Sequence, residues 1–153
     1  MFRKGDILEE IRVEDFSAYS KCIAKIDGQV IFIEQTAPGD VVDIRIIRKK
    51  KSYLEARPVY YHSFSSKRQT PFCVHYGTCG GCKWQHIQYP EQLDFKQQQV
   101  LDQLERIGHQ KDIKYEPIFG ATQHVAYRNK LEFTFTDQRW LTHDEINSGE
   151  TFE

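Results

Sequence analysis

Short runs of β-branched and aromatic residues, separated by turn residues, make up the N-terminal part of the chain, and they show no helical period. Asp27-Gly28 stands between two of these runs, and this pair favours a tight hairpin because glycine tolerates a positive φ. Several short strands at such close spacing predict a small five-stranded β-barrel, which leaves no free sheet edge. The five runs are residues 7–13, 19–26, 30–33, 41–47 and 53–61.

The pattern changes after residue 62. Residues 63–72 are polar and rich in serine, which predicts a linker. A helix is predicted over residues 90–107, with Pro90 in its first turn and Gly108 just after its end, because apolar residues there recur on one face. Two further strands are predicted over residues 113–118 and 131–135. Together these elements predict an α+β protein.

Composition restricts the class of protein. The chain has 153 residues, of which 39% are hydrophobic, and its 21 basic and 22 acidic residues give a formal net charge of -1. Its apolar runs are too short to cross a bilayer, and no apolar segment follows the basic residues at the N-terminus. We therefore expect a cytoplasmic protein without membrane contact, in which the thiols stay reduced.

The charge is unevenly distributed along the chain. Residues 45–68 hold eight basic side chains and one acidic side chain, a net charge of +7, and tyrosine and phenylalanine are interleaved with them. Cations that contact phosphates beside rings that stack on bases are what an RNA-binding surface needs. The alternative is a solvated hairpin whose lysines keep an edge strand soluble. The candidate phosphate contacts are Arg45, Arg48, Lys49, Lys50 and Lys51.

Three cysteines are closely spaced as C-x5-C-x2-C, with two glycines between the last two. They are Cys73, Cys79 and Cys82. Three thiolates on a tight loop can bind one metal centre, whereas a redox pair is disfavoured because no helix begins at the second CxxC cysteine. Two interpretations of this metal centre remain: an iron–sulfur cluster with a fourth thiolate from elsewhere, or a zinc site completed by His86 or His75. Cys22 lies in a predicted strand, where we expect a core residue.

The string from Cys73 to His86, C-x5-C-G-G-C-x-x-Q-H, follows the predicted barrel and precedes the predicted helix. This order resembles the RNA (uracil-5-)-methyltransferases, in particular the 23S ribosomal RNA branch with an N-terminal TRAM domain and a four-iron cluster. Tyr127-Arg128-Asn129-Lys130, followed by residues 131–135, is similar to a segment of the same family. The resemblance covers nearly the whole chain.

The resemblance implies a division of labour. Residues 1–62 would be an OB-like, RNA-binding TRAM barrel, and residues 73–153 part of a central region that contributes three of the four ligands of a 4Fe-4S cluster. The ligands would be Cys73, Cys79 and Cys82, and a second set of RNA contacts would be Tyr127, Arg128 and Lys130. The fourth cysteine, the catalytic residues and the S-adenosylmethionine domain would lie outside this sequence.

The resemblance thus implies the RNA-recognition and iron–sulfur portion of an S-adenosylmethionine-dependent methyltransferase acting on ribosomal RNA, inactive without its catalytic domain. The alternative is a standalone, zinc-stabilised RNA-binding adaptor. Without a catalytic domain to cover it, the apolar face of the predicted helix would promote self-association. That face consists of Leu93, Val100, Leu104 and Ile107.

Overall fold

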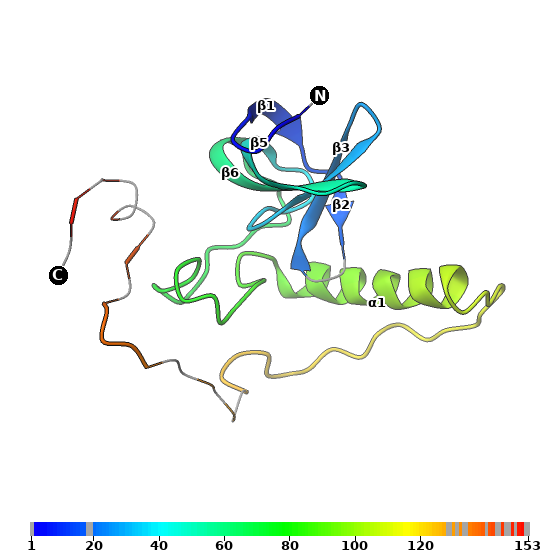
Figure 1. Ribbon diagram of the computed structural model, residues 1–153. Coiled ribbons are helices and arrows are strands. Elements are labelled where there is room, and N and C mark those ends of the chain that lie inside the picture. The colour runs from blue at the N-terminus through cyan, green and yellow to red at the C-terminus, as the bar shows by residue number, and fades with distance from the viewer. Residues whose placement is uncertain are drawn as a thin grey trace.

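The computed structural model contains a curved β-sheet, one long helix and an extended segment that follows the helix (Figure 1). It describes residues 2–17, 20–127, 130, 132, 135–139, 141, 142, 145, 148, 150 and 151. The strands are β1 (Ile7–Arg12), β2 (Asp15–Phe16), β3 (Cys22–Ile26), β4 (Gln29–Ile33), β5 (Val41–Lys49) and β6 (Tyr53–Ser63), and the helix is α1 (Tyr89–Arg106).

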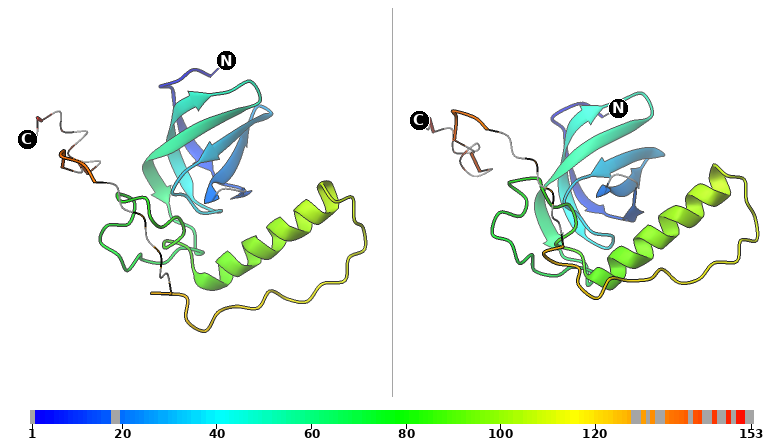
Figure 2. Two further views of the ribbon diagram at one scale, coloured as in Figure 1. Left: turned by 60° about the horizontal axis from the view of Figure 1, so that its bottom comes forward. Right: turned by 90° about the horizontal axis from the view of Figure 1, so that it is seen from below.

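The strands form one sheet in the order β1-β5-β6-β4-β3-β2, in which β4 and β6 run parallel and the other neighbours antiparallel. Only Val13 and Glu14 separate the two edge strands β1 and β2 along the chain, so the sheet curves strongly (Figure 2). The α+β class is confirmed, with a β-rich N-terminal part. The structure differs from the predicted barrel in two respects: β2 is an additional strand, and the sheet is not closed by pairing of β1 with β2 in the described part.

The hairpin between β3 and β4 is where the sequence predicts it. Ile26 pairs with Gln29, and Asp27 and Gly28 between them have positive φ values of 50° and 75°. Positive φ at both central residues is the geometry of a type I′ turn, whose twist matches that of the adjoining strands. This turn fixes the register of the hairpin.

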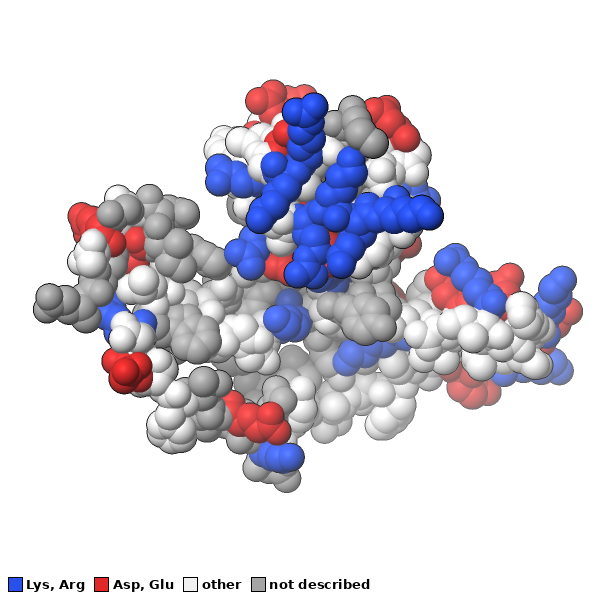
Figure 3. Space-filling model, in the orientation of Figure 1, with Lys and Arg blue, Asp and Glu red and all other residues white. Residues whose placement is uncertain are grey.

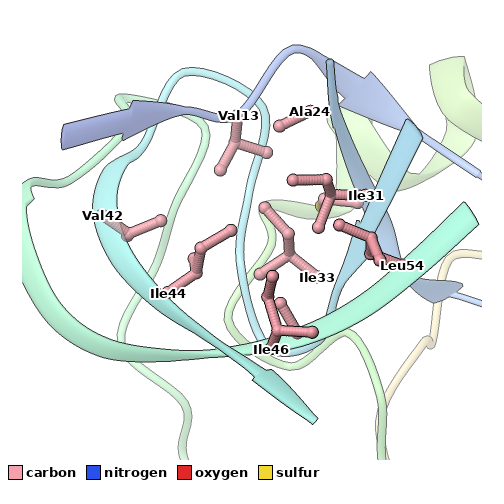
Figure 4. Packing of buried hydrophobic residues seen from close by; sticks show 10 residues of the cluster. Val13, Ala24, Ile31, Ile33, Val42, Ile44, Ile46 and Leu54 are labelled. Atoms are coloured by element: carbon pink, nitrogen blue, oxygen red, sulfur yellow. The ribbon is translucent and has the colours of Figure 1, made fainter. Parts of the chain in front are cut away.

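The sheet encloses the hydrophobic core (Figure 4). Alternate residues of β5 point inward, so Val42, Ile44 and Ile46 are buried while their neighbours face outward. Burying each branched side chain stabilises the fold by about 1.5–3 kcal/mol. The alternation therefore determines which face of β5 packs on the core and which remains in solvent. The labelled core residues are Val13, Ala24, Ile31, Ile33, Val42, Ile44, Ile46 and Leu54.

The helix α1 begins and ends within one residue of the predicted positions. It packs on the sheet through Phe95, whose ring stacks on Phe16 of β2 at 4.2 Å between centroids. Its apolar face is otherwise largely open: Val100 is 55% exposed, and Ile107, directly after the helix, is 76% exposed. Within the described residues, no helix is both long and apolar enough to cross a bilayer.

After α1 the chain runs back along the helix (Figures 1 and 2). The amide of Ile118 donates to Gln97 Oε1 at 2.8 Å, and that of Ala121 donates to Tyr89 Oη at 2.8 Å. The predicted strand over residues 113–118 is wrong: this segment is extended but pairs with no strand, because its neighbour is a helix whose backbone bonds are already used. The predicted strand over residues 131–135 falls largely outside the described residues.

Candidate RNA interface and cysteine loop

Five cations lie on the outer side of β5 and in the turn that follows, and we call them the basic strip. They are Arg45, Arg48, Lys49, Lys50 and Lys51, and all five are exposed. An irregularity in the β5–β6 pairing between Ile46 and Arg48 breaks the alternation, so that both Arg48 and Lys49 face solvent. Figure 3 shows Lys and Arg side chains gathered over the sheet.

The basic strip is largely unneutralised. Lys49 Nζ donates to the carbonyl of Phe2 at 2.9 Å, and the other four cations have no hydrogen bond or ion pair with any described residue. Glu55, which pairs in register with Arg48, instead has its carboxylate 3.6 Å from Lys21 Nζ. The positive charge is therefore available to an external anion.

Aromatic rings also lie on β6 and just after it. Tyr60 is 59% exposed and packs edge-on against His62, with ring centroids 4.9 Å apart. Phe64 is also exposed and stacks on Tyr61, whose hydroxyl donates to the carbonyl of Gln35 at 3.0 Å. Tyr60 is opposite Asp43, two residues along β5 from Arg45, whereas Phe64 lies under the guanidinium of Arg68 at 5.1 Å. That these rings stack on RNA bases stays a prediction.

The second predicted set is less well placed. Tyr127 is exposed in the segment that follows α1, and no hydrogen bond, ion pair or ring contact joins it to β5 within the described residues. Lys130 lies 3.7 Å from Glu132, and both side chains are exposed. Arg128 lies outside the described residues. The roles of these three residues stay predictions.

The three clustered cysteines lie on one loop, residues 70–84, which we call the cysteine loop. Two short segments, residues 67–69 and 85–88, close it and form the loop base. Arg68 and Ile87 form a β-bridge. The amide of Gln69 donates to the backbone carbonyl of His86, and that of Gln88 donates to the backbone carbonyl of Lys67, each at 3.0 Å. The loop is therefore held at its base like a hairpin, a feature that its composition gave no sign of.

Arg68 fastens the loop base to the sheet. Its guanidinium donates to the carboxylate of Asp40, from Nε to Oδ1 at 2.9 Å and from Nη2 to Oδ2 at 2.7 Å, and Asp40 has no exposed surface. The same carboxylate accepts the amides of Ala37 at 2.7 Å and Ser65 at 2.8 Å. Arg68 also lies over the ring of Tyr61 at 5.0 Å. The serine-rich segment is thus packed against the sheet.

A second fastening uses a buried histidine. His86 Nε2 lies 3.0 Å from the carbonyl oxygen of Thr36, and Nδ1 contacts the hydroxyl of Tyr76. Burial lowers the pKa of His86 below its ordinary value, and burial raises the pKa of Tyr76 to about 12. Because both ring nitrogens of His86 are engaged within the protein, this arrangement does not favour His86 as a zinc ligand.

Cys22, the cysteine that lies outside the cysteine loop, is a core residue. Cys22 is buried, its thiol donates to the carbonyl of Thr36 at 2.9 Å, and burial raises its pKa to about 12. A thiol held protonated in this way is neither a metal ligand nor a nucleophile. The interpretation of Cys22 as a packing residue agrees with this environment.

The thiols of the cysteine loop are more accessible: Cys73 is half-buried, and Cys79 and Cys82 are exposed. Their chemistry fits a thiolate-bound metal centre. The side-chain positions do not, because no three His, Cys, Asp or Glu side chains of the described part converge as a metal-binding group. The structure therefore supplies the donors on one loop without the assembled coordination sphere.

Comparison with known proteins places these features in context. Residues 8–59 match the TRAM domain. A protein of Bacteroides thetaiotaomicron named uncharacterized RNA methyltransferase is 50% identical over 137 residues, which are 90% of this chain and 30% of that protein. One of Chlorobaculum tepidum, named uncharacterized RNA methyltransferase CT0009, is 38% identical over 151 residues, which are 97% of this chain and 31% of that protein.

A conserved protein of Methanococcus maripaludis solved in solution is 28% identical, with a TM-score of 0.35, over 37% of this chain and 80% of that protein. The chain spans about 30% of the length of the curated relatives named above. Homology to proteins named RNA methyltransferase therefore extends over almost all of these 153 residues but over less than a third of each relative.

Proposed function

We propose that this chain, which carries a TRAM domain and is homologous to the N-terminal part of proteins named RNA methyltransferase, is the RNA-recognition part of an RNA (uracil-5-)-methyltransferase. The observation that carries the proposal is the basic strip, four of whose five cations have no partner among the described residues. Cations exposed without a partner bind phosphate at little cost, because no existing ion pair must be broken.

In this function the chain binds and orients RNA, and it carries out no step of methyl transfer. S-adenosylmethionine would supply the methyl group in the remainder of the full-length enzyme. The fastened loop base would hold the cysteine loop in a constant position relative to the basic strip. We further propose ribosomal RNA as the substrate, on the strength of the sequence resemblance, and the cytoplasm as the compartment, as expected from the sequence composition.

RNA titration tests the proposal. We expect the 153-residue chain to bind RNA, with log affinity falling linearly against log salt concentration. Each phosphate contacted on a single strand contributes about -0.7 to that slope. Fluorescence anisotropy with a labelled RNA measures it. Absence of RNA binding even at low salt would contradict the proposal.

We also propose that Cys73, Cys79 and Cys82 are three ligands of a 4Fe-4S cluster in the full-length enzyme. Support comes from three accessible thiols on a loop whose base is fixed, and from the engagement of His86 elsewhere, which removes one candidate zinc ligand. When bound, the cluster would serve to hold the loop and position RNA.

Anaerobic purification of the full-length enzyme, followed by iron and sulfide analysis, tests the cluster. We expect iron with visible absorbance, lost in Cys79→Ser and retained in Cys22→Ala, because only the first variant removes an accessible thiol. Stoichiometric zinc in a colourless protein would favour the zinc-stabilised adaptor instead.

Finally, we propose that the 153-residue chain self-associates through the apolar face of α1, because Val100 and Ile107 are more than half exposed. Sedimentation velocity over a range of concentrations measures this. Only monomer at high concentration would contradict it, and Val100→Glu should shift any dimer toward monomer.

A further inference from the structure

We infer that the outer face of β5 and β6 binds single-stranded RNA, with a phosphate held by Arg45 and Arg57 and an unpaired base stacked on Tyr60. The inference rests on the proposed function and deepens it, because it names the strandedness of the RNA and the residues that select it. Three features of this face support it: a pair of like charges, an exposed ring with a supporting neighbour, and the spacing between them.

The pair of like charges consists of Arg45 and Arg57, which lie directly opposite each other in the antiparallel pairing of β5 with β6. Both are exposed, and like charges in this position oppose strand pairing. The side chain of Arg45 has no hydrogen bond or ion pair with a described residue. Arg57 Nε lies 3.4 Å from Glu34 Oε2, and Lys21 Nζ lies 3.3 Å from Oε1 of the same carboxylate. A bound phosphate would relieve the repulsion, because its oxygens can accept from both guanidinium groups.

The exposed ring belongs to Tyr60, which is opposite Asp43 in the same strand pair. Its neighbour on the face is His62, whose ring packs edge-on against it and whose Nε2 lies 2.6 Å from Asp43 Oδ1. The amide of Glu10 also donates to Asp43 at 2.8 Å, and this bond, followed by that from His62, lowers the pKa of Asp43. The carboxylate of Asp43 thus fixes the position of the His62 ring, and the His62 ring in turn packs against the ring of Tyr60.

The spacing suits one nucleotide. Asp43 and Arg45 are two residues apart on β5, so the Tyr60 and Arg45–Arg57 positions are separated by about 6.6 Å along the strand. A chain with a stacked base at one position and its phosphate at the other must present that base unpaired. A duplex, whose bases are covered by their neighbours, would contact only the cations.

The test compares two probes: a labelled single-stranded RNA about 16 nucleotides long, and the same RNA annealed to its complement. In the 153-residue chain, Tyr60→Ala and Tyr60→Leu should weaken binding of the single strand about 5- to 100-fold, while Tyr60→Phe retains it. Duplex binding should be unchanged in all three variants. Tyr115→Ala is the matched control, because Tyr115 is also 59% exposed but lies beyond α1. Circular dichroism verifies that each variant is folded.

Each outcome decides the inference. Selective loss of single-strand affinity in Tyr60→Ala and Tyr60→Leu supports it. If the chain binds RNA and Tyr60→Ala behaves like Tyr115→Ala, or if duplex and single strand lose affinity equally, the inference is overturned while the proposed function stands. If the unaltered chain binds neither probe at low salt, both are overturned.

Discussion

Replacing Asp40 by alanine is expected to lower the free energy of unfolding by about 3–5 kcal/mol, because it leaves the guanidinium of Arg68 largely buried without a counter-charge. The side chain of Arg68 is only 16% exposed, and Asp40 is fully buried. The variant also leaves the amides of Ala37 and Ser65 without their acceptor. Urea unfolding followed by circular dichroism measures the change.

Two further variants isolate the Arg68–Asp40 interaction. Asp94→Ala removes an exposed carboxylate from α1 and should change the free energy of unfolding by no more than about 0.5 kcal/mol. Asp40→Ala combined with Arg68→Ala should destabilise the protein by less than the sum of the two single changes, because the unpaired charge is then gone. Strict additivity, or an Asp40→Ala variant as stable as Asp94→Ala, would contradict this account.

Reversing the charge of two residues of the basic strip, Lys50→Glu with Lys51→Glu, should lower RNA affinity more than tenfold at low salt. The slope of log affinity against log salt should become shallower by about 1.4, because two phosphate contacts on a single strand are lost. Neither lysine side chain has a hydrogen bond or ion pair in the described part of the chain, so the fold should be unaffected.

The matched control is Lys111→Glu with Lys114→Glu, which makes the same change of net charge at two exposed lysines beyond α1. If affinity depends on where the charge lies, this control should retain most of the binding and most of the salt slope. Equal losses in the two double variants would show that RNA responds to net charge alone and would remove the basic strip as a defined interface.

Much of the sheet can be predicted from sequence because its determinants are local. The alternation of Val42, Ile44 and Ile46 places one face of β5 in the core, and Asp27-Gly28 specifies the turn between β3 and β4. The helix is equally local, with Pro90 in its first turn and an apolar face of helical period. The outward direction of Arg45 follows from the same alternation, whereas Arg48 and Lys49 both face solvent because the pairing is irregular between Ile46 and Arg48.

The features that the sequence does not reveal depend on contacts between distant residues. Asp40 follows Pro38-Gly39 and has the pattern of an ordinary turn residue, and its burial depends on Arg68, 28 positions later. His86 is engaged by Thr36, 50 positions earlier. Residues 113–118 have strand-like composition, but no strand of the described part is available to pair with them. The composition of a segment indicates its structural propensity, but the structure at these three places depends on residues distant in the sequence that contact them or fail to pair with them.

We expect the two fastenings of the loop base to couple its stability to that of the sheet. The carbonyl of Thr36 accepts from Cys22 within the core and engages His86 from the loop base, so one peptide group belongs to both substructures. Because opening either substructure breaks a contact to this shared peptide group, we expect the two to unfold as one cooperative unit. Hydrogen exchange should therefore find the amides of Gln69 and Gln88 protected as strongly as those of the strand interior, while the tip that carries the thiols exchanges independently.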